Sequence, residues 1–307
     1  MPGASWAQLF ENEACCFFQN WSVALLADLL ELYLRHRHDL RSLRARRATF
    51  ERHVLPALGA IPVAELRRSQ IALMLDRVAL HAGPVMADRT LAYLRAALHW
   101  YEARTDDWRS PIVRGMHRRA GSERTRVLSN EELRRIWGAT EGGAPFSRLV
   151  RVLLLTGQRR GEVAGMQWHE VDVAARLWTI PPERFKSGQA QLVPLPQVVI
   201  ELLGSRGAGG PYICSTTNGR RPISGFGKAV ARLQRRSRTN GWRLHDLRRT
   251  VRTRLAGLRV PHAVAELVLG HGKRGLARVY DQHQYLDEVR EALERWAAEL
   301  ERIGAIR

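Results

Sequence analysis

Apolar residues recur at helical spacing over the first third of the chain. They return every three or four positions, which is the period of an α-helix with one buried face. Basic residues gather between these positions, most densely over residues 35–47, and proline and glycine punctuate residues 55–62 as in a turn. The pattern predicts a small bundle of helices with basic outer faces over residues 24–115. The apolar positions of two of its helices are Leu26, Leu29, Leu30, Tyr33 and Leu34, and Leu91, Leu94, Leu98 and Tyr101.

The pattern changes at residues 116–128, which are rich in Arg, Gly, Ser and Thr and have few large apolar side chains. This composition is typical of an interdomain linker. Ser129 and Glu132 then stand at capping-box spacing ahead of a new apolar period, so a helix is expected to begin there. A second domain is therefore predicted over residues 129–307, and residues 1–23 form a short N-terminal extension.

Within the second domain, helical and strand patterns follow one another. Leu149–Leu155 is a continuous apolar run that predicts a buried helix, whereas Leu177–Ile180 and Leu192–Leu195 flank a turn at Lys186–Gly188 and predict a β-hairpin or small sheet. From Gly225 onward the helical pattern returns. The expected fold class is mainly α with a small β-sheet, an α+β fold in two domains.

Composition and charge limit the classes of function that fit this chain. A chain of 307 residues with 45% hydrophobic residues can build two cores, which argues against a largely disordered protein. Its 49 Lys and Arg against 30 Asp and Glu give a formal net charge of +19. Such a surface repels itself until a polyanion neutralises it, so nucleic acid is the first candidate partner.

Cysteine usage and hydropathy indicate the compartment. Cys15, Cys16 and Cys214 form neither a disulfide framework nor a zinc-ligand pattern, as expected in a reducing environment. No apolar run approaches the roughly 18 residues that cross a bilayer, and Glu11 and Glu13 replace the basic start of a secretory signal. We expect a cytoplasmic, nucleoid-associated protein without a membrane partner.

Two arginines mark the first candidate site. Arg159 and Arg160 follow Thr156-Gly157, where the buried helix is expected to stop, so either guanidinium can be held at a turn that faces a cleft. Glu162 is close enough in sequence to orient Arg159. A guanidinium in this position is suited to bind a non-bridging oxygen of a phosphate.

Further candidates follow some ninety residues later. His245 and Arg248 are three positions apart in a helical stretch, so they project toward the same ligand. His271 and two tyrosines, Tyr280 and Tyr285, come next. A phenol, with an ordinary pKa of about 10, attacks phosphorus once a base takes its proton or cations stabilise the phenolate. From the residues alone, either tyrosine fits.

The order and spacing of these residues resemble the tyrosine recombinase, or phage integrase, family. The family pattern Thr-Gly-x-Arg-x-x-Glu selects Arg159 over Arg160. Leu269-Gly270-His271 matches the later histidine, and the nine-residue step from His271 favours Tyr280 over Tyr285 as the nucleophile. Lys186, on the expected hairpin turn, resembles the lysine that protonates the departing 5′ oxygen.

The resemblance covers about residues 24–300 and implies an architecture. The helical region resembles the family's core-binding, SAM-like domain, and residues 129–307 resemble its catalytic domain. The segment after Tyr280 looks most like integrases of prophages and genomic islands. Those commonly carry an extra N-terminal domain for arm sites, which residues 1–23 are too short to hold.

The resemblance also implies a reaction. Tyr280 would attack the scissile phosphate, leaving a 3′-phosphotyrosine and a free 5′ hydroxyl, and the 5′ hydroxyl of a partner strand would then reverse the step. Arg159 and Arg248 would stabilise the transition state, while His245 and His271 would hydrogen-bond or move protons. No nucleotide cofactor and no metal are expected, because the phosphotyrosine conserves the bond energy and arginines supply the positive charge.

Double-stranded DNA is the expected partner, and the resemblance implies four protomers on two duplexes, with accessory directionality or bending factors. An apolar seam near the C-terminus either packs on its own domain or docks on a neighbouring protomer, since family members often exchange C-terminal segments. The expected function is integration or excision of a mobile element. The alternatives are a recombinase that resolves dimers, a relaxing topoisomerase, and a DNA-binding protein without catalysis. The seam residues are Leu286, Val289, Leu293, Trp296, Leu300 and Ile303.

Overall fold

The computed structural model describes residues 25–118, 124–185, 188–271, 283 and 285–306. The chain divides into two compact units, residues 1–123 and 124–307, and each has its own apolar core. The division falls inside the stretch expected as a linker. The two ends of that stretch pack on the units, because Met116 is buried in the first core and Leu128 in the second.

The first unit is a bundle of helices. The expected apolar faces of α2 and α6 are confirmed, since every residue named for them is buried. Gly83, with φ of +86°, separates α5 from α6, and Pro84 starts α6, where its missing N–H costs nothing. The elements are α2 (Leu26–His36), α3 (Leu43–Thr49), the π-helical η1 (Phe50–Val54), α4 (Leu55–Leu58), the 3-10 helix η2 (Val63–Glu65), α5 (Arg68–Ala82) and α6 (Pro84–Glu102).

The turn expected over residues 55–62 begins later than the sequence pattern suggests. Leu55–Leu58 is helical and continues α3 through η1, so the chain turns only at Gly59 and Ala60. In η1 the N–H of Leu55 bonds to the carbonyl of Phe50, five residues back. A π-helical turn is wider than an α-helical one, and Pro56, which has no N–H to donate, lies two residues after the end of η1.

The second unit combines helices with one small sheet, which confirms the expected fold class. The antiparallel strands lie in the order β1-β2-β3, with Val171 opposite Trp178 and Ile180 opposite Gln191. None of the described helices has both the length and the apolar character needed to cross a bilayer. The elements are α7 (Asn130–Gly138), α8 (Pro145–Thr156), α9 (Arg160–Ala164), η3 (Trp168–Glu170), β1 (Val171–Asp172), β2 (Leu177–Ile180), β3 (Gln191–Pro194), α10 (Gln197–Leu203), α11 (Phe226–Ser237), α12 (Leu244–Gly257), α13 (His262–Val268) and α15 (Leu286–Arg302).

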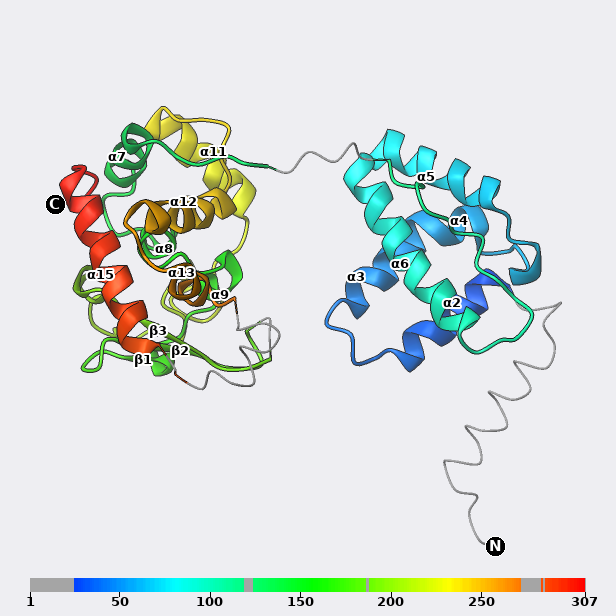
Figure 1. Cartoon of the computed structure of the whole chain (residues 1–307), viewed down its shortest axis with the longest axis horizontal. Helices are drawn as coiled ribbons and strands as arrows, with labels where there is room; N and C mark the ends of the chain where they lie inside the picture. Colours follow the sequence, from blue (N-terminus) through cyan, green and yellow to red (C-terminus); the bar gives the residue numbers. More distant parts are fainter. Residues whose placement is uncertain (1–24, 119–123, 186–187, 272–282, 284, 307) are drawn as a thin grey trace, which may run out of the picture. The chain divides into compact units, whose positions relative to one another are not determined.

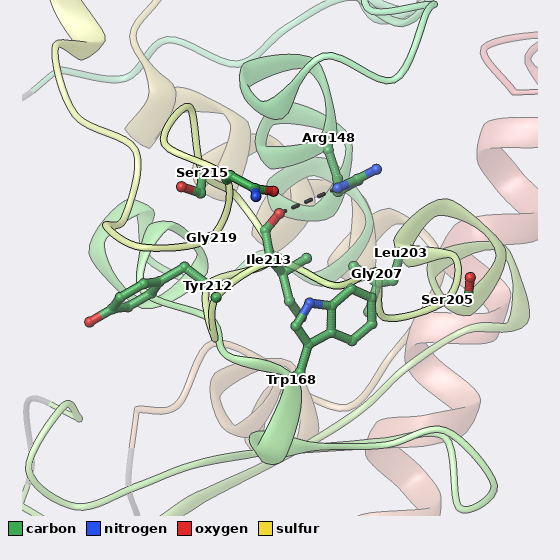
Figure 2. A pocket seen from close by; sticks show the side chains of 12 residues that line it. Arg148, Trp168, Leu203, Ser205, Gly207, Tyr212, Ile213, Ser215 and Gly219 are labelled. Atoms are coloured by element: carbon green, nitrogen blue, oxygen red, sulfur yellow. Dashed lines mark hydrogen bonds between the residues drawn. The ribbon is translucent and has the colours of Figure 1, made fainter.

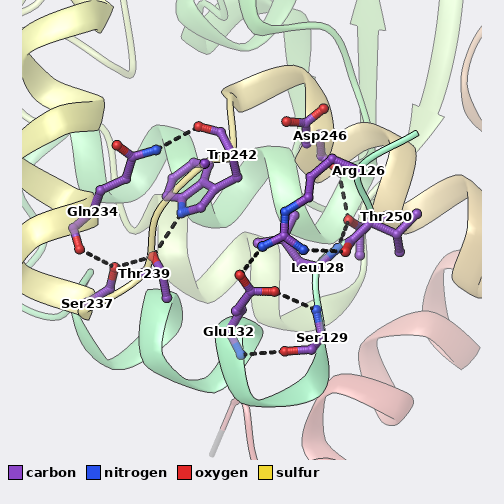
Figure 3. Close-up of polar contacts among 12 residues, drawn as sticks. Arg126, Leu128, Ser129, Glu132, Gln234, Ser237, Thr239, Trp242, Asp246 and Thr250 are labelled. Carbon is purple, nitrogen blue, oxygen red and sulfur yellow. Dashed lines mark hydrogen bonds and ion pairs between the residues drawn. The ribbon is translucent and has the colours of Figure 1, made fainter. Parts of the chain in front are cut away.

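Local polar contacts fix the start of the second unit (Figure 3). Ser129 and Glu132 form the expected capping box: the Ser129 hydroxyl accepts from the Glu132 N–H (3.2 Å), and the Glu132 carboxylate accepts from the Ser129 N–H (2.9 Å). The N–H of Leu128 donates to the hydroxyl of Thr250 on α12 (3.0 Å). The incoming chain is thereby tied to the helix that carries His245 and Arg248.

The C-terminal seam packs on its own unit. Helix α15 (red in Figure 1) contacts α8, α12, α13 and β3. Trp296 is fully buried, and its indole N–H donates to the carbonyl of Leu154 at 2.8 Å. Of the two placements that the sequence leaves open, the structure therefore has the seam inside the domain core.

We expect Trp296→Ala to lower the free energy of unfolding by about 3–5 kcal/mol, the usual cost of truncating a buried tryptophan. The change removes the packing of α15 and leaves the carbonyl of Leu154 without its donor. Denaturant unfolding measures the loss. Glu291→Ala, on the exposed side of the same helix, serves as control and should stay within about 0.5 kcal/mol of the parent protein; equal losses in both variants would contradict the placement of the seam.

Candidate active site

Arg248 lies at the centre of the candidate site. It is only 4% exposed, although it carries a positive charge. Its Nη1 donates to the carbonyl of Gly157 (2.9 Å), and its Nη2 donates to the carbonyl of Leu269 and to Nε2 of His271 (3.1 Å). Burial, and then the nearby charge of Arg159, lower the pKa of Arg248 to about 10. The contacts of this buried cation are two carbonyls and an imidazole nitrogen instead of a carboxylate.

Two glycine turns present the acceptors of Arg248. Gly157 ends α8 with φ of +65°, and Gly270 follows α13 with φ of +63°. The N–H of Gly270 donates to the carbonyl of Leu267 (2.8 Å), and the N–H of His271 donates to that of Glu266 (2.9 Å). This pair of bonds is a Schellman motif. It turns the chain sharply after α13 and so places His271 against Arg248.

Arg159 is the N-cap residue directly before α9 and is held by one carboxylate. Glu162, which is buried, accepts from Nη1 of Arg159 and from its backbone N–H, both at 2.8 Å. The guanidinium lies over the ring of Phe185, 5.2 Å from its centroid, and about a quarter of the side chain (27%) stays accessible. The neighbouring Arg160 instead lies over the ring of Phe226 at 4.6 Å. The two arginines are therefore held in different ways.

His245 stands at the mouth of the site on the first turn of α12. With Arg159 and Arg248 it borders a cavity of about 590 Å³ between α9, α11 and α12. Although the residue as a whole is exposed, partial desolvation of its ring and then the charges of Arg248 and Arg249 lower the pKa of His245. The ring is thus neutral at neutral pH and can accept a hydrogen bond or a proton.

His271 connects Arg248 to a carboxylate that the sequence analysis did not select. Its Nδ1 lies 2.6 Å from Oε2 of Glu266, whose Oε1 accepts from Nε of Arg252, also at 2.6 Å. Burial alone would raise the pKa of Glu266, but hydrogen bonds from Arg252 and His271 outweigh it and hold the pKa below its usual range. The signal in the sequence was a glutamate five residues ahead of His271, on the helix that the Leu-Gly turn ends.

The structure brings together five of the seven residues selected from the sequence, and these come from segments far apart in the chain. They are Arg159, Glu162, His245, Arg248 and His271. Lys186 and Tyr280 lie outside the described residues. Tyr285, the competing tyrosine, immediately precedes α15, and its ring meets that of His283 edge-on at 4.5 Å. Within the described part of the chain, no three His, Cys, Asp or Glu side chains are placed to hold a metal ion.

A second, smaller hollow has a different character (Figure 2). It measures about 200 Å³ and is lined by a glycine-rich loop together with Arg148 and Trp168. Arg148 donates to the carbonyl of Ile213 at 3.3 Å. None of the residues selected from the sequence lines this hollow, and no histidine or carboxylate does. Its lining includes one phenol, that of Tyr212, but no histidine or carboxylate that could take its proton, so the chemistry is assigned to the site around Arg248.

Comparison with known proteins identifies similar sequences. The phage integrase family model matches residues 126–286, which is more than half of the chain. Prophage integrase IntZ of Escherichia coli K12 is 28% identical over 171 residues, covering 53% of this chain and 42% of the relative. Prophage integrase IntF of the same strain is 27% identical over 268 residues, covering 79% and 55%. The chain thus spans about half the length of the curated relatives it matches.

Solved structures share the fold across both units. The Tn1549 transposon integrase in complex with transposon right end DNA superposes with a TM-score of 0.66 at 16% identity, covering 89% of this chain and 100% of that chain. A lambda integrase dimer bound to a COC′ core site gives a TM-score of 0.62 at 20% identity, covering 81% and 96%. A lambda integrase tetramer bound to a Holliday junction gives 0.60 at 21% identity, covering 87% and 79%.

We expect Gly270→Ala to destabilise the protein by about 1–3 kcal/mol, because a side chain with φ of +63° is strained. A Cβ atom there would also clash with the side chain of Gln191 and come within 2.6 Å of Phe185. Thermal unfolding measures the effect. Gly207→Ala is the matched control, since its Cβ would meet no atom within 4 Å; an equal fall in both variants would count against a special requirement at the turn.

Proposed function

The chain belongs to the phage integrase family, and from that premise we propose that it is a tyrosine-type site-specific recombinase. It cleaves and rejoins DNA through a 3′-phosphotyrosine intermediate. The proposed biological role is integration or excision of a mobile element, which the names of the curated relatives support. We assign residues 24–115 to core-site binding, 116–128 to a linker and 129–307 to catalysis.

The buried charge of Arg248 is the observation that carries this proposal. A buried cation without a paired carboxylate is costly, and a bound phosphate supplies the missing negative charge. Arg159 stands nearby with its guanidinium partly accessible. Two guanidiniums can bind the two non-bridging oxygens of one phosphodiester and stabilise the charge that develops as phosphorus is attacked.

The proposed reaction is an in-line displacement at phosphorus. The phenolic oxygen of Tyr280 bonds to phosphorus while the bond to the 5′ oxygen breaks. His245, which is neutral, is suited to accept the phenolic proton. Lys186 gives a proton to the departing 5′ oxygen, so that atoms and charge balance. A 5′ hydroxyl then attacks the phosphotyrosine and releases Tyr280. Neither a metal nor a nucleotide cofactor takes part.

Double-stranded DNA is the proposed partner, consistent with a formal charge of +19. We propose a tetramer on two duplexes, acting with accessory directionality or bending factors in the cytoplasm, where the nucleoid lies. The seam of α15 is occupied within its own unit. Exchange of C-terminal segments between protomers would therefore require either other residues or displacement of α15.

Covalent trapping tests the function. Wild-type protein and Tyr280→Phe are mixed with nicked suicide duplexes drawn from the DNA that flanks the gene. After cleavage, the short fragment that carries the 5′ hydroxyl dissociates at the nick and cannot be rejoined. The wild-type protein should therefore accumulate a 3′-linked DNA adduct that peptide mapping locates on Tyr280. The variant lacks the nucleophile and should form none. Tight DNA binding without any adduct would favour a binding protein, whereas an adduct on Tyr285 would move the nucleophile and keep the class.

We expect Arg159→Ala to slow adduct formation by about 100- to 1,000-fold, the usual cost of removing one preorganised donor to transition-state charge. Arg160→Ala should slow it less than about tenfold, because that arginine is held against Phe226 and away from Glu162. Single-turnover rates on one suicide duplex make the comparison. If the larger loss fell on Arg160, the assignment of the phosphate ligand would be wrong.

A further inference from the structure

Glu266 lies one hydrogen bond behind His271, and neither the comparisons nor the sequence pattern assigns it a role. Its two carboxylate oxygens have different partners: Oε1 accepts from Nε of Arg252 and Oε2 faces Nδ1 of His271, both at 2.6 Å. We propose that Glu266 is a positioning residue that holds His271 in the neutral tautomer with its proton on Nδ1. The inference rests on the proposed function and deepens it.

The donors and acceptors that face the two ring nitrogens determine the tautomer of His271. Arg248 has only N–H donors, so Nε2 of His271, 3.1 Å from Nη2, must offer a lone pair. The Glu266 carboxylate, which Arg252 keeps ionised, has only acceptors, so Nδ1 must carry the proton. Each nitrogen of the ring thus faces the one kind of partner that this tautomer satisfies.

The contacts form a closed chain between two helices. Arg252 stands one helical turn after Arg248 on α12, and Glu266 is on α13, so the chain leaves α12 and returns to it. His262, on the same helix as Glu266, is the further titratable neighbour, 3.9 Å from Oε1. The carboxylate brings negative charge toward the buried guanidinium without contacting it. Arg248 therefore keeps its place, and a phosphate can still supply the direct counter-charge.

Loss of the carboxylate should reverse the tautomer. In Glu266→Gln, Arg252 can bond only to the amide oxygen, which turns the amide NH₂ toward His271. Nδ1 must then accept, the proton moves to Nε2, and an N–H would face the N–H of Arg248. Two donors repel each other, so the Arg248 guanidinium loses one of its three fixed contacts.

The test uses the full-length protein labelled with ¹⁵N-histidine, with His271→Ala to assign the His271 signals. The ¹⁵N spectrum distinguishes a protonated from an unprotonated ring nitrogen. We expect protonated Nδ1 and unprotonated Nε2 in the wild-type protein, and the reverse in Glu266→Gln. The rate of adduct formation on a suicide duplex should fall by about 10- to 100-fold, as for lost partners of metal-bound histidines, while DNA affinity changes less than threefold.

Glu294→Gln is the matched control. Glu294 is likewise partly exposed and pairs with an arginine, Arg176, at 3.0 Å, but has no contact with His271. It should leave the His271 spectrum and the cleavage rate unchanged. Should Glu266→Gln fail to fold, Glu266→Asp keeps the charge and must retain protonated Nδ1.

Three results would overturn the proposal: protonated Nε2 in the wild-type protein or in Glu266→Asp, an unchanged tautomer in Glu266→Gln, or a reversed tautomer with an unchanged cleavage rate. The spectrum requires no DNA. Absence of any wild-type adduct would therefore refute the proposed recombinase and leave the tautomer assignment standing.

Discussion

The buried charge of Arg248 is the constraint on which the candidate site depends. A guanidinium that is 4% exposed must satisfy its N–H groups within the protein. Three of its hydrogen bonds go to the carbonyls of Gly157 and Leu269 and to His271, which come from two glycine turns. These acceptors take up three of the five N–H donors of the guanidinium, and none of them is a carboxylate. The site is therefore ordered before a ligand arrives and still favours an anion.

Glycine geometry makes that arrangement possible. A carbonyl can point at Arg248 only where the chain leaves a helix abruptly, and Gly157 and Gly270 do so with positive φ. The Schellman motif at Gly270 also brings the side chains of Glu266 and His271 together, although the two residues are five positions apart in the sequence. One local turn thus supplies an acceptor for the arginine, the position of a histidine and the carboxylate that fixes its proton.

Three carboxylates around the cationic site each hold neighbouring groups in position. Glu162 holds Arg159 by both its backbone and its side chain, Glu266 holds His271, and Asp246, almost fully buried, accepts from Arg124 and Arg249. The hydrogen bonds of Arg248 go to other groups. The negative charges of these three carboxylates thus hold in position the groups around the guanidinium of Arg248. A phosphodiester bound at the site would be the ligand that meets the remaining charge directly.

The sequence by itself predicted most of the elements and a set of candidate residues, because both depend on local spacing. The periods of α2 and α6, the capping box at Ser129 and the short sheet were predictable from neighbours a few residues away. So was the choice of arginines and histidines suited to phosphate, with the family resemblance selecting among them.

Tertiary structure decided what depends on distant partners. From the sequence, the seam of α15 could pack on its own domain or on a neighbouring protomer. The burial of Trp296 against Leu154 decides for its own domain. The role of Glu266 was equally hidden, because an acidic residue on an amphipathic helix is usually a solvated charge. Only folding brings Arg252 and His271 to its two carboxylate oxygens. Sequence spacing does not show a hydrogen bond of this kind, because the partners come from different segments and meet only in the folded chain.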